Sequence, residues 1–140
     1  MSHHSASADE TLSIGRGLSR RLGPGSVILL VGPLGAGKTV LAKGIAEGLG
    51  IHDQIISPTY TIVSEYREGS VHLFHVDLYR VEGRDQLENL GLDDLLRDDA
   101  VVLIEWGEKA GAMLEGNFTR VTMALADDGG RDILVEEVAG

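Results

Sequence analysis

The sequence of 140 residues contains no cysteine and has few basic side chains. Without cysteine, neither a disulfide nor a thiolate metal site can form, which suits a reducing compartment. Lysine and arginine total 12 against 22 aspartate and glutamate residues, which gives a formal net charge of −10. A surface this acidic repels phosphate backbones, so we do not expect the chain to bind nucleic acid by itself.

Long hydrophobic runs are also missing. The longest apolar run in the early part of the chain, residues 27–31, is too short for a signal peptide or a membrane span. We therefore expect a cytoplasmic protein without membrane contact. A chain of this length fits one domain and buries roughly 70% of its unfolded surface. We predict a flexible leader over residues 1–8 and a single domain over residues 9–140.

Hydrophobic periodicity and turn residues divide the chain into helices and strands. Ser7 and Glu10 have the spacing of a capping box, so a helix should begin near Ala8 and end before the turn at 23–25. The elements expected after it are helices over 39–49 and 85–98, the latter broken at Gly91, and strands over 27–31, 57–66 (after an initial turn), 71–80, 100–106, 117–127 and 131–139. This order predicts an α/β fold in three layers, with a mixed, centrally parallel sheet flanked by helices.

The segment "GPLGAGKT" at residues 32–39 lies between a predicted buried strand and a predicted amphipathic helix. Gly32, Gly37, Lys38 and Thr39 fill the P-loop pattern, and this context makes the match specific. Glycines let backbone N–H groups converge on phosphate oxygens, and the helix N-terminus adds more donors. Lys38 supplies a positive charge for the β- and γ-phosphates, and the Thr39 hydroxyl can bind Mg²⁺. We therefore expect a P-loop NTPase-like fold that binds a nucleoside triphosphate.

Two carboxylates follow predicted strands and are candidates for the metal site. Glu105 ends "VVLIE" and Asp77 follows "HLFHV". Mg²⁺ bound through a P-loop also needs a carboxylate, usually at the C-terminal end of a neighbouring strand. The alternative for each residue is a solvated acid at a strand end. The spacing does not say which of the two binds the metal and which orients water.

The segment "SPTYT" at residues 57–61 lies where nucleotide hydrolases have switch segments. Thr59 and Thr61 are candidates to sense the γ-phosphate, and an ordinary turn into a strand is the alternative. His75 is interpreted as a core histidine rather than a base. Trp106 directly follows Glu105, and we expect it to pack in the core, although its position also places it near the site.

Four motifs in this order, "GPLGAGKT", "SPTYT", "HVDLYR" and "IEWGE", make residues 9 to 138 resemble the TsaE family. The family consists of small bacterial P-loop ATPases of tRNA threonylcarbamoyladenosine biosynthesis. The resemblance implies that the chain binds the partner proteins TsaD and TsaB, which modify adenosine 37 of tRNA. It also implies that ATP and Mg²⁺ are the cofactors, and that contact with tRNA is only indirect, through the complex.

The resemblance also implies roles for individual residues. Thr39 and Glu105 match the magnesium-binding positions, and Asp77 matches a second acid beside the phosphates. Catalytic roles are expected for Asp77, Glu105 and Lys38, and metal binding for Thr39, Glu105 and Asp77. The residues expected to contact ATP are Thr11, Gly32, Gly35, Ala36, Gly37, Lys38, Thr39, Val40, Thr59, Gly130 and Arg131. The regions around Thr11 and 129–131 match those that flank adenine, and the alternative there is a helix start and a hairpin turn.

Three other functions fit the P-loop. A small-molecule kinase usually needs an arginine-bearing lid, and the sequence has no basic segment of that kind. A GTPase usually reads guanine with an N-K-x-D loop, and the sequence has none. A nucleotide-gated binding module that does not hydrolyse ATP stays open as an alternative. We expect an ATPase that is slow alone and activated by its partners, because an arginine supplied in trans raises turnover by about 10³–10⁵ in the best-studied GTPases.

Overall fold

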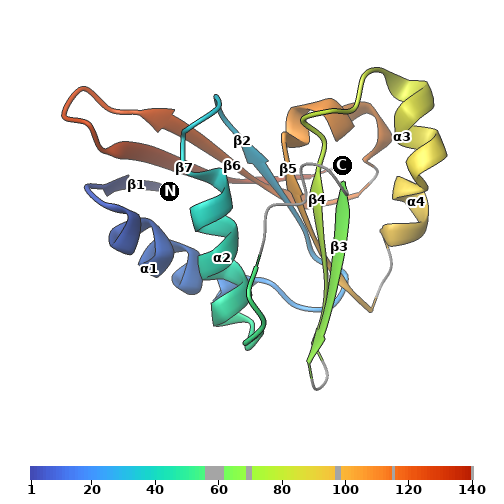
Figure 1. Cartoon of the computed structure of the whole chain (residues 1–140), viewed down its shortest axis with the longest axis horizontal. Helices are drawn as coiled ribbons and strands as arrows, with labels where there is room; N and C mark the ends of the chain where they lie inside the picture. Colours follow the sequence, from blue (N-terminus) through green and yellow to red (C-terminus); the bar gives the residue numbers. More distant parts are fainter. Residues whose placement is uncertain (56–61, 69–70, 97–98, 115, 140) are drawn as a thin grey trace.

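The computed structural model describes residues 1–55, 62–68, 71–96, 99–114 and 116–139 (Figure 1). Its helical elements, in chain order, are α1 (Ala8–Leu18), η1 (Ser19–Arg21), α2 (Lys38–Gly48), α3 (Arg84–Leu90), α4 (Leu92–Leu95) and η2 (Gly107–Met113). Its strands are β1 (Ser2–Ser5), β2 (Val27–Val31), β3 (Val63–Glu68), β4 (Val71–Asp77), β5 (Val101–Glu105), β6 (Phe118–Leu125) and β7 (Arg131–Val138). None of the helices in this described part of the chain has the length and hydropathy of a transmembrane segment.

The strands form one seven-stranded sheet in the order β1-β7-β6-β2-β5-β4-β3 (Figure 1). Its central strands β6, β2, β5 and β4 run parallel to one another. The outer strands β7, β1 and β3 pair in the antiparallel direction. The predicted mixed, centrally parallel sheet is therefore confirmed. Because the central strands are parallel, the C-terminal ends of β2, β5 and β4 meet at one edge, where ligands of α/β sheets usually bind.

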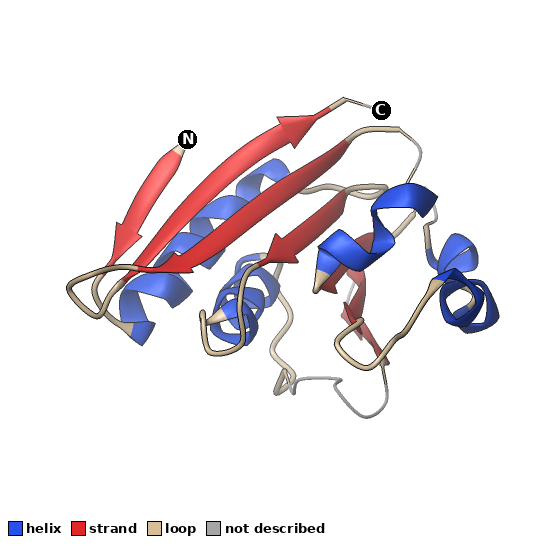
Figure 2. Ribbon diagram, turned by 90° about the horizontal axis from the view of Figure 1, so that it is seen from above, coloured by secondary structure: helices blue, strands red, loops and turns tan. Residues whose placement is uncertain are grey.

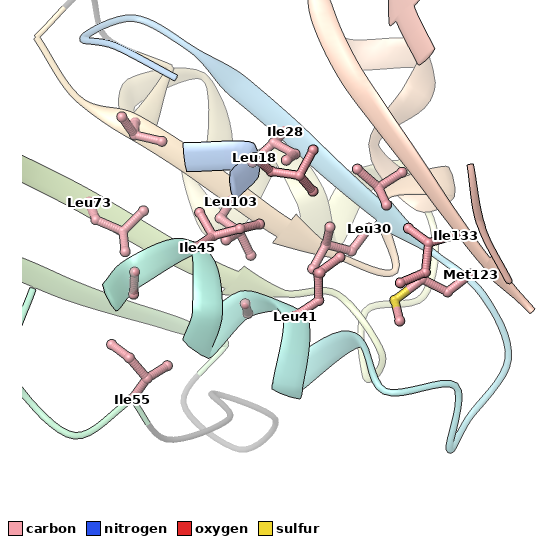
Figure 3. Close-up of a cluster of buried hydrophobic side chains, with 14 of the residues drawn as sticks. Leu18, Ile28, Leu30, Leu41, Ile45, Ile55, Leu73, Leu103, Met123 and Ile133 are labelled. Carbon is pink, nitrogen blue, oxygen red and sulfur yellow. The ribbon is translucent and has the colours of Figure 1, made fainter. Parts of the chain in front are cut away.

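Alternate side chains of the central strands pack on opposite faces of the sheet. In β2, Ile28 and Leu30 belong to one buried cluster, which also contains Leu41 and Ile45 of α2 (Figure 3). Leu29 belongs to a second buried cluster, which includes residues of α3, α4 and η2. The two clusters confirm the predicted three layers, and Figure 2 shows the sheet from above with its helices in separate groups.

Helices α1 and α2 contact each other through glycines. A Cβ atom on Gly15 would lie 2.6 Å from the carbonyl oxygen of Leu41. A Cβ atom on Gly44 would overlap the carbonyl oxygen of Leu12. The two backbones can approach this closely only because glycine has no side chain. The contact fixes α1, and the N-terminal residues before it, against the helix that follows the P-loop.

Strands β3 and β4 form the predicted hairpin, and its register pairs Val63 with Val76. Strand β4 ends at Asp77 rather than at residue 80, because the chain turns there and Asp77 Oδ1 accepts a hydrogen bond from the Tyr79 N–H at 2.9 Å. The predicted start of the hairpin, including 57–61, lies outside the described residues. Gly91 separates α3 from α4 as predicted, with a φ of 77°.

The first residues differ from the predicted flexible leader over 1–8. Ser2–Ser5 form β1, an edge strand that pairs with β7 from Ser2↔Leu134 to Ser5↔Arg131. The pairing partners are more than a hundred residues away in the sequence, so a local pattern gives no sign of them. Ser7 caps α1 as predicted, because its hydroxyl accepts a hydrogen bond from the Glu10 N–H at 3.2 Å.

Candidate functional site

Residues 32–37 connect β2 to α2 and carry the predicted P-loop sequence. Gly35 and Gly37 have φ values of 81° and 95°, which favour glycine. Gly32 lies against β6, where a Cβ atom would come within 2.5 Å of the carbonyl oxygen of Met123. The Gly37 carbonyl accepts a hydrogen bond from the Leu41 N–H at 3.0 Å. The backbone N–H groups of the first turn of α2 have no partner within the helix and are suited to bind an anion.

Lys38 begins α2, and its side chain is only 5% exposed. Its ammonium group donates hydrogen bonds to the carbonyl oxygens of Gly32 and, at 3.0 Å, Pro33. The same nitrogen lies 3.8 Å from the ring centroid of Trp106, a cation–π contact. Burial lowers the pKa of Lys38, while the carboxylates of Glu105, Glu108 and Asp77 act to raise it.

Thr39 and Glu105 lie together, as the sequence predicts for a magnesium site. The Thr39 hydroxyl donates to Glu105 Oε1 at 3.0 Å. The other carboxylate oxygen of Glu105, Oε2, lies 2.6 Å from His75 Nε2. Glu105 is 3% exposed and His75 is 1% exposed, so this contact is buried. The core position predicted for His75 is confirmed, but its contact with Glu105 was not predicted.

Asp77 lies beside Glu105 because β4 and β5 pair in parallel with these two residues opposite each other. Its carboxylate accepts the hydrogen bond from the Tyr79 N–H described above, and the residue is 2% exposed. Both acids therefore emerge from strand ends at the same edge of the sheet. The hydrogen bond between the Thr39 hydroxyl and Glu105 places these two oxygen donors together, which makes Glu105 a candidate metal ligand.

A pocket of about 450 Å³ brings most of the predicted site residues together. Its lining consists of Leu34, Gly35, Ala36, Gly37, Lys38, Thr39, Val40, Asp77, Tyr79, Glu105, Trp106 and Arg131. Gly32 is not part of this lining, although its carbonyl oxygen accepts a hydrogen bond from Lys38. Thr59, also predicted to contact the nucleotide, lies outside the described residues.

The aromatic rings of Tyr79 and Trp106 form one wall of this pocket. The sequence placed Trp106 near the site but did not indicate Tyr79. The rings of Tyr79 and Trp106 lie 5.1 Å apart between centroids. Trp106 has a φ of 59°, an unusual conformation for a residue other than glycine, and it is half-buried rather than fully in the core. Lys109 donates hydrogen bonds to the carbonyl oxygens of Tyr79 and Val81 at 2.8 and 3.1 Å, which fixes the segment after β4.

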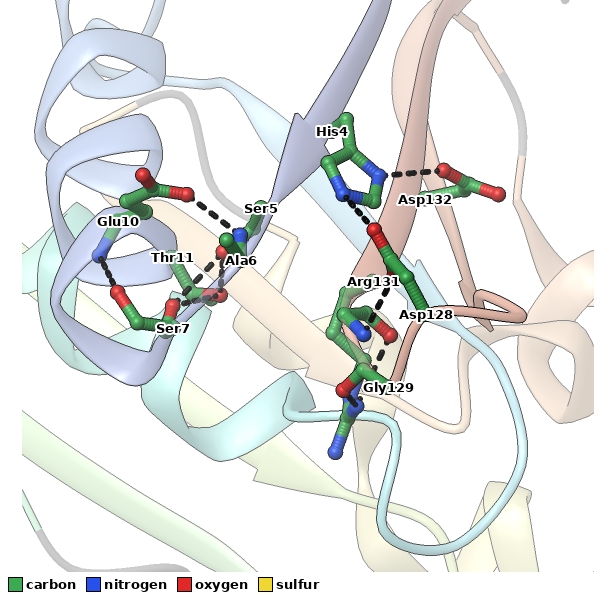
Figure 4. A network of polar contacts seen from close by, with 11 residues as sticks. His4, Ser5, Ala6, Ser7, Glu10, Thr11, Asp128, Gly129, Arg131 and Asp132 are labelled. Carbon is green, nitrogen blue, oxygen red and sulfur yellow. Dashed lines mark hydrogen bonds and ion pairs between the residues drawn. The ribbon is translucent and has the colours of Figure 1, made fainter.

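A second, smaller pocket of about 160 Å³ lies between the N-terminal segment and the β6–β7 turn. It contains Thr11 and Gly130 of the predicted residues that are absent from the first pocket, and its lining is Ser5, Ala6, Ser7, Ala8, Thr11, Gly37, Val40, Gly129, Gly130 and Arg131. The hydroxyls of Ser5 and Thr11 are hydrogen-bonded at 2.7 Å (Figure 4). The sequence indicated Thr11 and 129–131 but not Ser5, because Ser5 reaches the pocket only through the pairing of β1 with β7.

Charged groups hold the N-terminal strand near this second pocket. His4 contacts Asp132 and Asp128, each at 3.0 Å (Figure 4). The hydrogen bond to Asp132 raises the pKa of His4, and the charge of Asp128 adds to this effect. The Gly130 N–H donates to Asp128, and this hydrogen bond lowers the pKa of Asp128. These contacts join β1 to the β6–β7 turn that lines the pocket.

Arg131 lies between the two pockets and contributes to both linings. Its guanidinium donates to the carbonyl oxygens of Gly35 and Ala36, each at 3.1 Å. It also donates to the carbonyl oxygens of Gly129 and Gly130, each at 3.0 Å. Arg131 therefore ties the residues between β2 and α2 to the β6–β7 turn, so that the two pockets lie side by side.

The donor chemistry of the first pocket fits Mg²⁺. Mg²⁺ prefers oxygen ligands, keeps several waters, and is usually held by one or two carboxylates together with substrate phosphates. The Thr39 hydroxyl and the Glu105 carboxylate are oxygen donors of this kind. Within the part of the chain that the structure describes, no group of three or more His, Cys, Asp or Glu residues could hold a metal ion. A site of few protein ligands suits Mg²⁺ completed by nucleotide phosphates.

Comparison with known proteins gives consistent matches over most of the chain. The family model described as "Threonylcarbamoyl adenosine biosynthesis protein TsaE" matches residues 5–133. A relative from Bacillus subtilis, named tRNA threonylcarbamoyladenosine biosynthesis protein TsaE, is 41% identical over 125 residues, which cover 89% of this chain and 78% of the relative. A relative of the same name from Treponema pallidum is 37% identical over 131 residues, which cover 94% of this chain and 96% of the relative.

The fold is also similar to that of a solved structure. The crystal structure of Bacillus subtilis YdiB superposes with a TM-score of 0.82 at 33% sequence identity. The superposition covers all of this chain and 86% of the YdiB chain. The similarity therefore includes the sheet, the P-loop and the strand ends that carry the two acids.

Proposed function

The chain belongs to the TsaE family of threonylcarbamoyl adenosine biosynthesis proteins, and from this we propose that it is an ATPase that acts with TsaD and TsaB in tRNA modification. Its relatives carry the name of tRNA threonylcarbamoyladenosine biosynthesis proteins. ATP binds in the first pocket with its phosphates at the P-loop, and its base lies toward the second pocket. Hydrolysis of ATP then serves the modification reaction without direct contact between this chain and the tRNA.

The observation that carries the proposal is the hydrogen bond between Thr39 and Glu105, 3.0 Å long, beside the buried ammonium group of Lys38. These side chains come from a helix N-terminus and from a strand 66 residues further along the chain. Their charges and oxygens are those that a magnesium-bound triphosphate requires. A glycine-rich turn without a ligand gives no reason for a buried lysine and a buried carboxylate to share one pocket.

The residues of the chain have separate tasks in this proposal. The P-loop amides and Lys38 bind the β- and γ-phosphates, and Thr39 and Glu105 hold the metal. Mg²⁺, when bound, neutralises charge that develops on the phosphate oxygens. Asp77, which lies beside Glu105 on the neighbouring strand, orients the attacking water or the water shell of the metal.

We expect turnover by the chain alone to be slow. Arg131 lines the pocket, but its guanidinium is already bonded to four backbone carbonyl oxygens. Hydrolases of this kind gain most of their rate from a further positive group at the γ-phosphate. TsaD and TsaB, or the ordering that their binding produces, are the proposed source of this activation.

The test is release of inorganic phosphate from ATP by the purified chain, first alone and then with TsaD and TsaB. We expect slow release by the chain alone and faster release in the complex. Lys38→Ala should abolish both rates, while Lys43→Ala, an exposed lysine on the same helix, should not. If ATP binds tightly but no phosphate is released in either condition, the chain is a nucleotide-gated binding module and not an ATPase.

A further inference from the structure

We propose that His75 is a positioning residue for the metal site: its imidazole holds the Glu105 carboxylate in the orientation that faces Thr39. This inference rests on the proposed function, because it concerns the same magnesium-dependent pocket. The contact that carries it is the buried one between His75 Nε2 and Glu105 Oε2, 2.6 Å long. Since a carboxylate accepts, the ring nitrogen Nε2 is the donor.

The sheet places His75 where it can act on Glu105. Strands β4 and β5 are parallel neighbours, and their register pairs His75 with Leu103 and Asp77 with Glu105 (Figure 1). Side chains two residues apart on a strand share a face of the sheet. His75, Asp77 and Glu105 therefore lie on one face, and Glu105 is the diagonal neighbour of His75 across the two strands.

Each oxygen of the Glu105 carboxylate has its own partner. Oε1 accepts the hydroxyl of Thr39, and Oε2 accepts Nε2 of His75. Two partners on opposite oxygens define the plane of the carboxylate, which one partner alone cannot do. With Oε2 bonded to His75, Oε1 is the oxygen directed at the Thr39 hydroxyl, and these two oxygens would hold Mg²⁺ when it is bound.

The second ring nitrogen of His75 indicates that the residue is not there for packing alone. Among the described residues, His75 Nδ1 is buried and has no hydrogen-bond partner. A buried polar atom without a partner is unfavourable, and an apolar side chain at this position would avoid it. The hydrogen bond to Glu105 is therefore the polar contact that orients the imidazole, and it accounts for a histidine at this position.

His72, on the same strand, shows the contrasting case. It is 6% exposed, and both of its ring nitrogens have partners: Nε2 contacts Glu65, and Nδ1 lies 3.2 Å from an Arg67 nitrogen. Because it is three residues from His75, it faces the opposite side of the sheet. His72 is thus a buried histidine paired with a carboxylate outside the pocket, and it provides a matched control.

The experiment measures metal binding separately from nucleotide binding. The full chain is saturated with a non-hydrolysable ATP analogue in metal-free buffer and titrated with Mg²⁺ by calorimetry. A parallel titration with Mn²⁺ is followed by electron paramagnetic resonance, which reports the ligands of the ion. The variants are His75→Leu, which removes the donor, His75→Gln, whose amide can replace it, and the control His72→Leu.

Outer partners of metal ligands are typically worth 10- to 100-fold in metal affinity. We therefore expect His75→Leu to weaken Mg²⁺ binding by about 10- to 100-fold and to alter the Mn²⁺ spectrum. Affinity for the analogue without metal should stay unchanged. His75→Gln should restore most of the loss, and His72→Leu should leave Mg²⁺ binding as in the original chain.

Each other result overturns the inference. Equal losses with and without metal, or a loss that His75→Gln does not restore, would make His75 a purely structural residue. If His75→Leu folds and its Mg²⁺ affinity is unchanged, His75 does not position the metal ligand Glu105. If His75→Leu does not fold, His75→Asn, whose shorter amide does not reach Glu105, takes its place with the same criteria. Failure of the original chain to bind the analogue at all would instead overturn the proposed function, and this inference with it.

Discussion

At the scale of single residues, Lys38 is unusual because its charged side chain is buried. Lysine is rarely buried without partners, because its ammonium group loses hydration. Here the partners are two P-loop carbonyl oxygens and the face of Trp106. These contacts hold the charge at the entrance of the phosphate cradle, where a triphosphate can exchange with them. Under the proposed function, burial of this charge serves binding of the phosphates rather than stability of the core.

The first prediction concerns this charge. Lys38→Ala should weaken binding of Mg-ATP by about 10- to 150-fold, since hydrogen bonds to charged groups are worth about 1.5–3 kcal/mol each. Isothermal calorimetry gives the dissociation constant, and the fluorescence of Trp106, the single tryptophan of the chain, gives an independent signal. Lys43→Ala on the exposed side of the same helix serves as the control. An unchanged dissociation constant in Lys38→Ala would exclude phosphate binding by the P-loop.

The second prediction separates the two acids. Glu105→Gln should weaken Mg²⁺-dependent binding of ATP by about 10- to 150-fold, because Glu105 is the acid bonded to Thr39. Asp77→Asn should retain binding and lower single-turnover hydrolysis by about 10²–10⁴, the range for a residue that handles a proton or a water. Binding is measured with and without Mg²⁺, and hydrolysis by release of phosphate. The reverse pattern would exchange the two roles, and no effect in either variant would mean that neither acid takes part in metal binding or hydrolysis.

Individual site residues were predictable where the signal was local in the sequence. Gly37, Lys38 and Thr39 form one contiguous motif, and Asp77 and Glu105 each end an apolar strand, so the sequence indicates both their type and their place. The contact between His75 and Glu105 was not predictable, because it depends on the register of β4 against β5. A histidine on a strand looks the same in sequence whether it faces a metal site or the core.

At the scale of elements, the same distinction explains what the sequence predicted about the fold. Strand β2 and helix α2 were predicted almost to the residue, because periodicity and glycine boundaries define them locally. Strand β1 was missed, since it is short and polar and pairs with β7, more than a hundred residues further along the chain. The helical turn η2 was missed as well. It packs against the sheet where a Cβ atom on Gly107 would lie 2.5 Å from Leu29 Cβ, and this contact has no local signature.

The third prediction tests the glycine contact between α1 and α2. Gly44→Ala should destabilise the fold by about 1–3 kcal/mol, the usual cost of overpacking, because the new Cβ would overlap the Leu12 carbonyl oxygen. Gly17→Ala is the matched control: Gly17 is exposed in α1, and a Cβ there has no atom within 4 Å. It should stabilise the chain by about 0.4–1 kcal/mol. Urea unfolding measures both, and equal effects of the two variants would contradict the close approach of the helices.

At the scale of the whole molecule, the sheet brings distant segments to one edge. The P-loop, the ends of β4 and β5, and the β6–β7 turn converge around two neighbouring pockets. Arg131 joins the first of these segments to the last through bonds that span more than ninety residues of sequence. Arg131 therefore links the P-loop to the turn beside the N-terminal segment, which pairs with β7 and lines the second pocket.

The last prediction concerns tRNA binding, which the negative net charge disfavours for the isolated chain. With 12 basic against 22 acidic residues, the chain can neutralise few phosphates and release few counterions. We expect no binding of tRNA by the isolated chain at concentrations up to about 100 µM in physiological salt, which is the weak end of non-specific binding. Fluorescence anisotropy of labelled tRNA measures this, and binding should be seen only when TsaD and TsaB are added. Tight binding by the chain alone, lost at high salt, would mean that it contacts the tRNA directly and that the partners are not its route to the substrate.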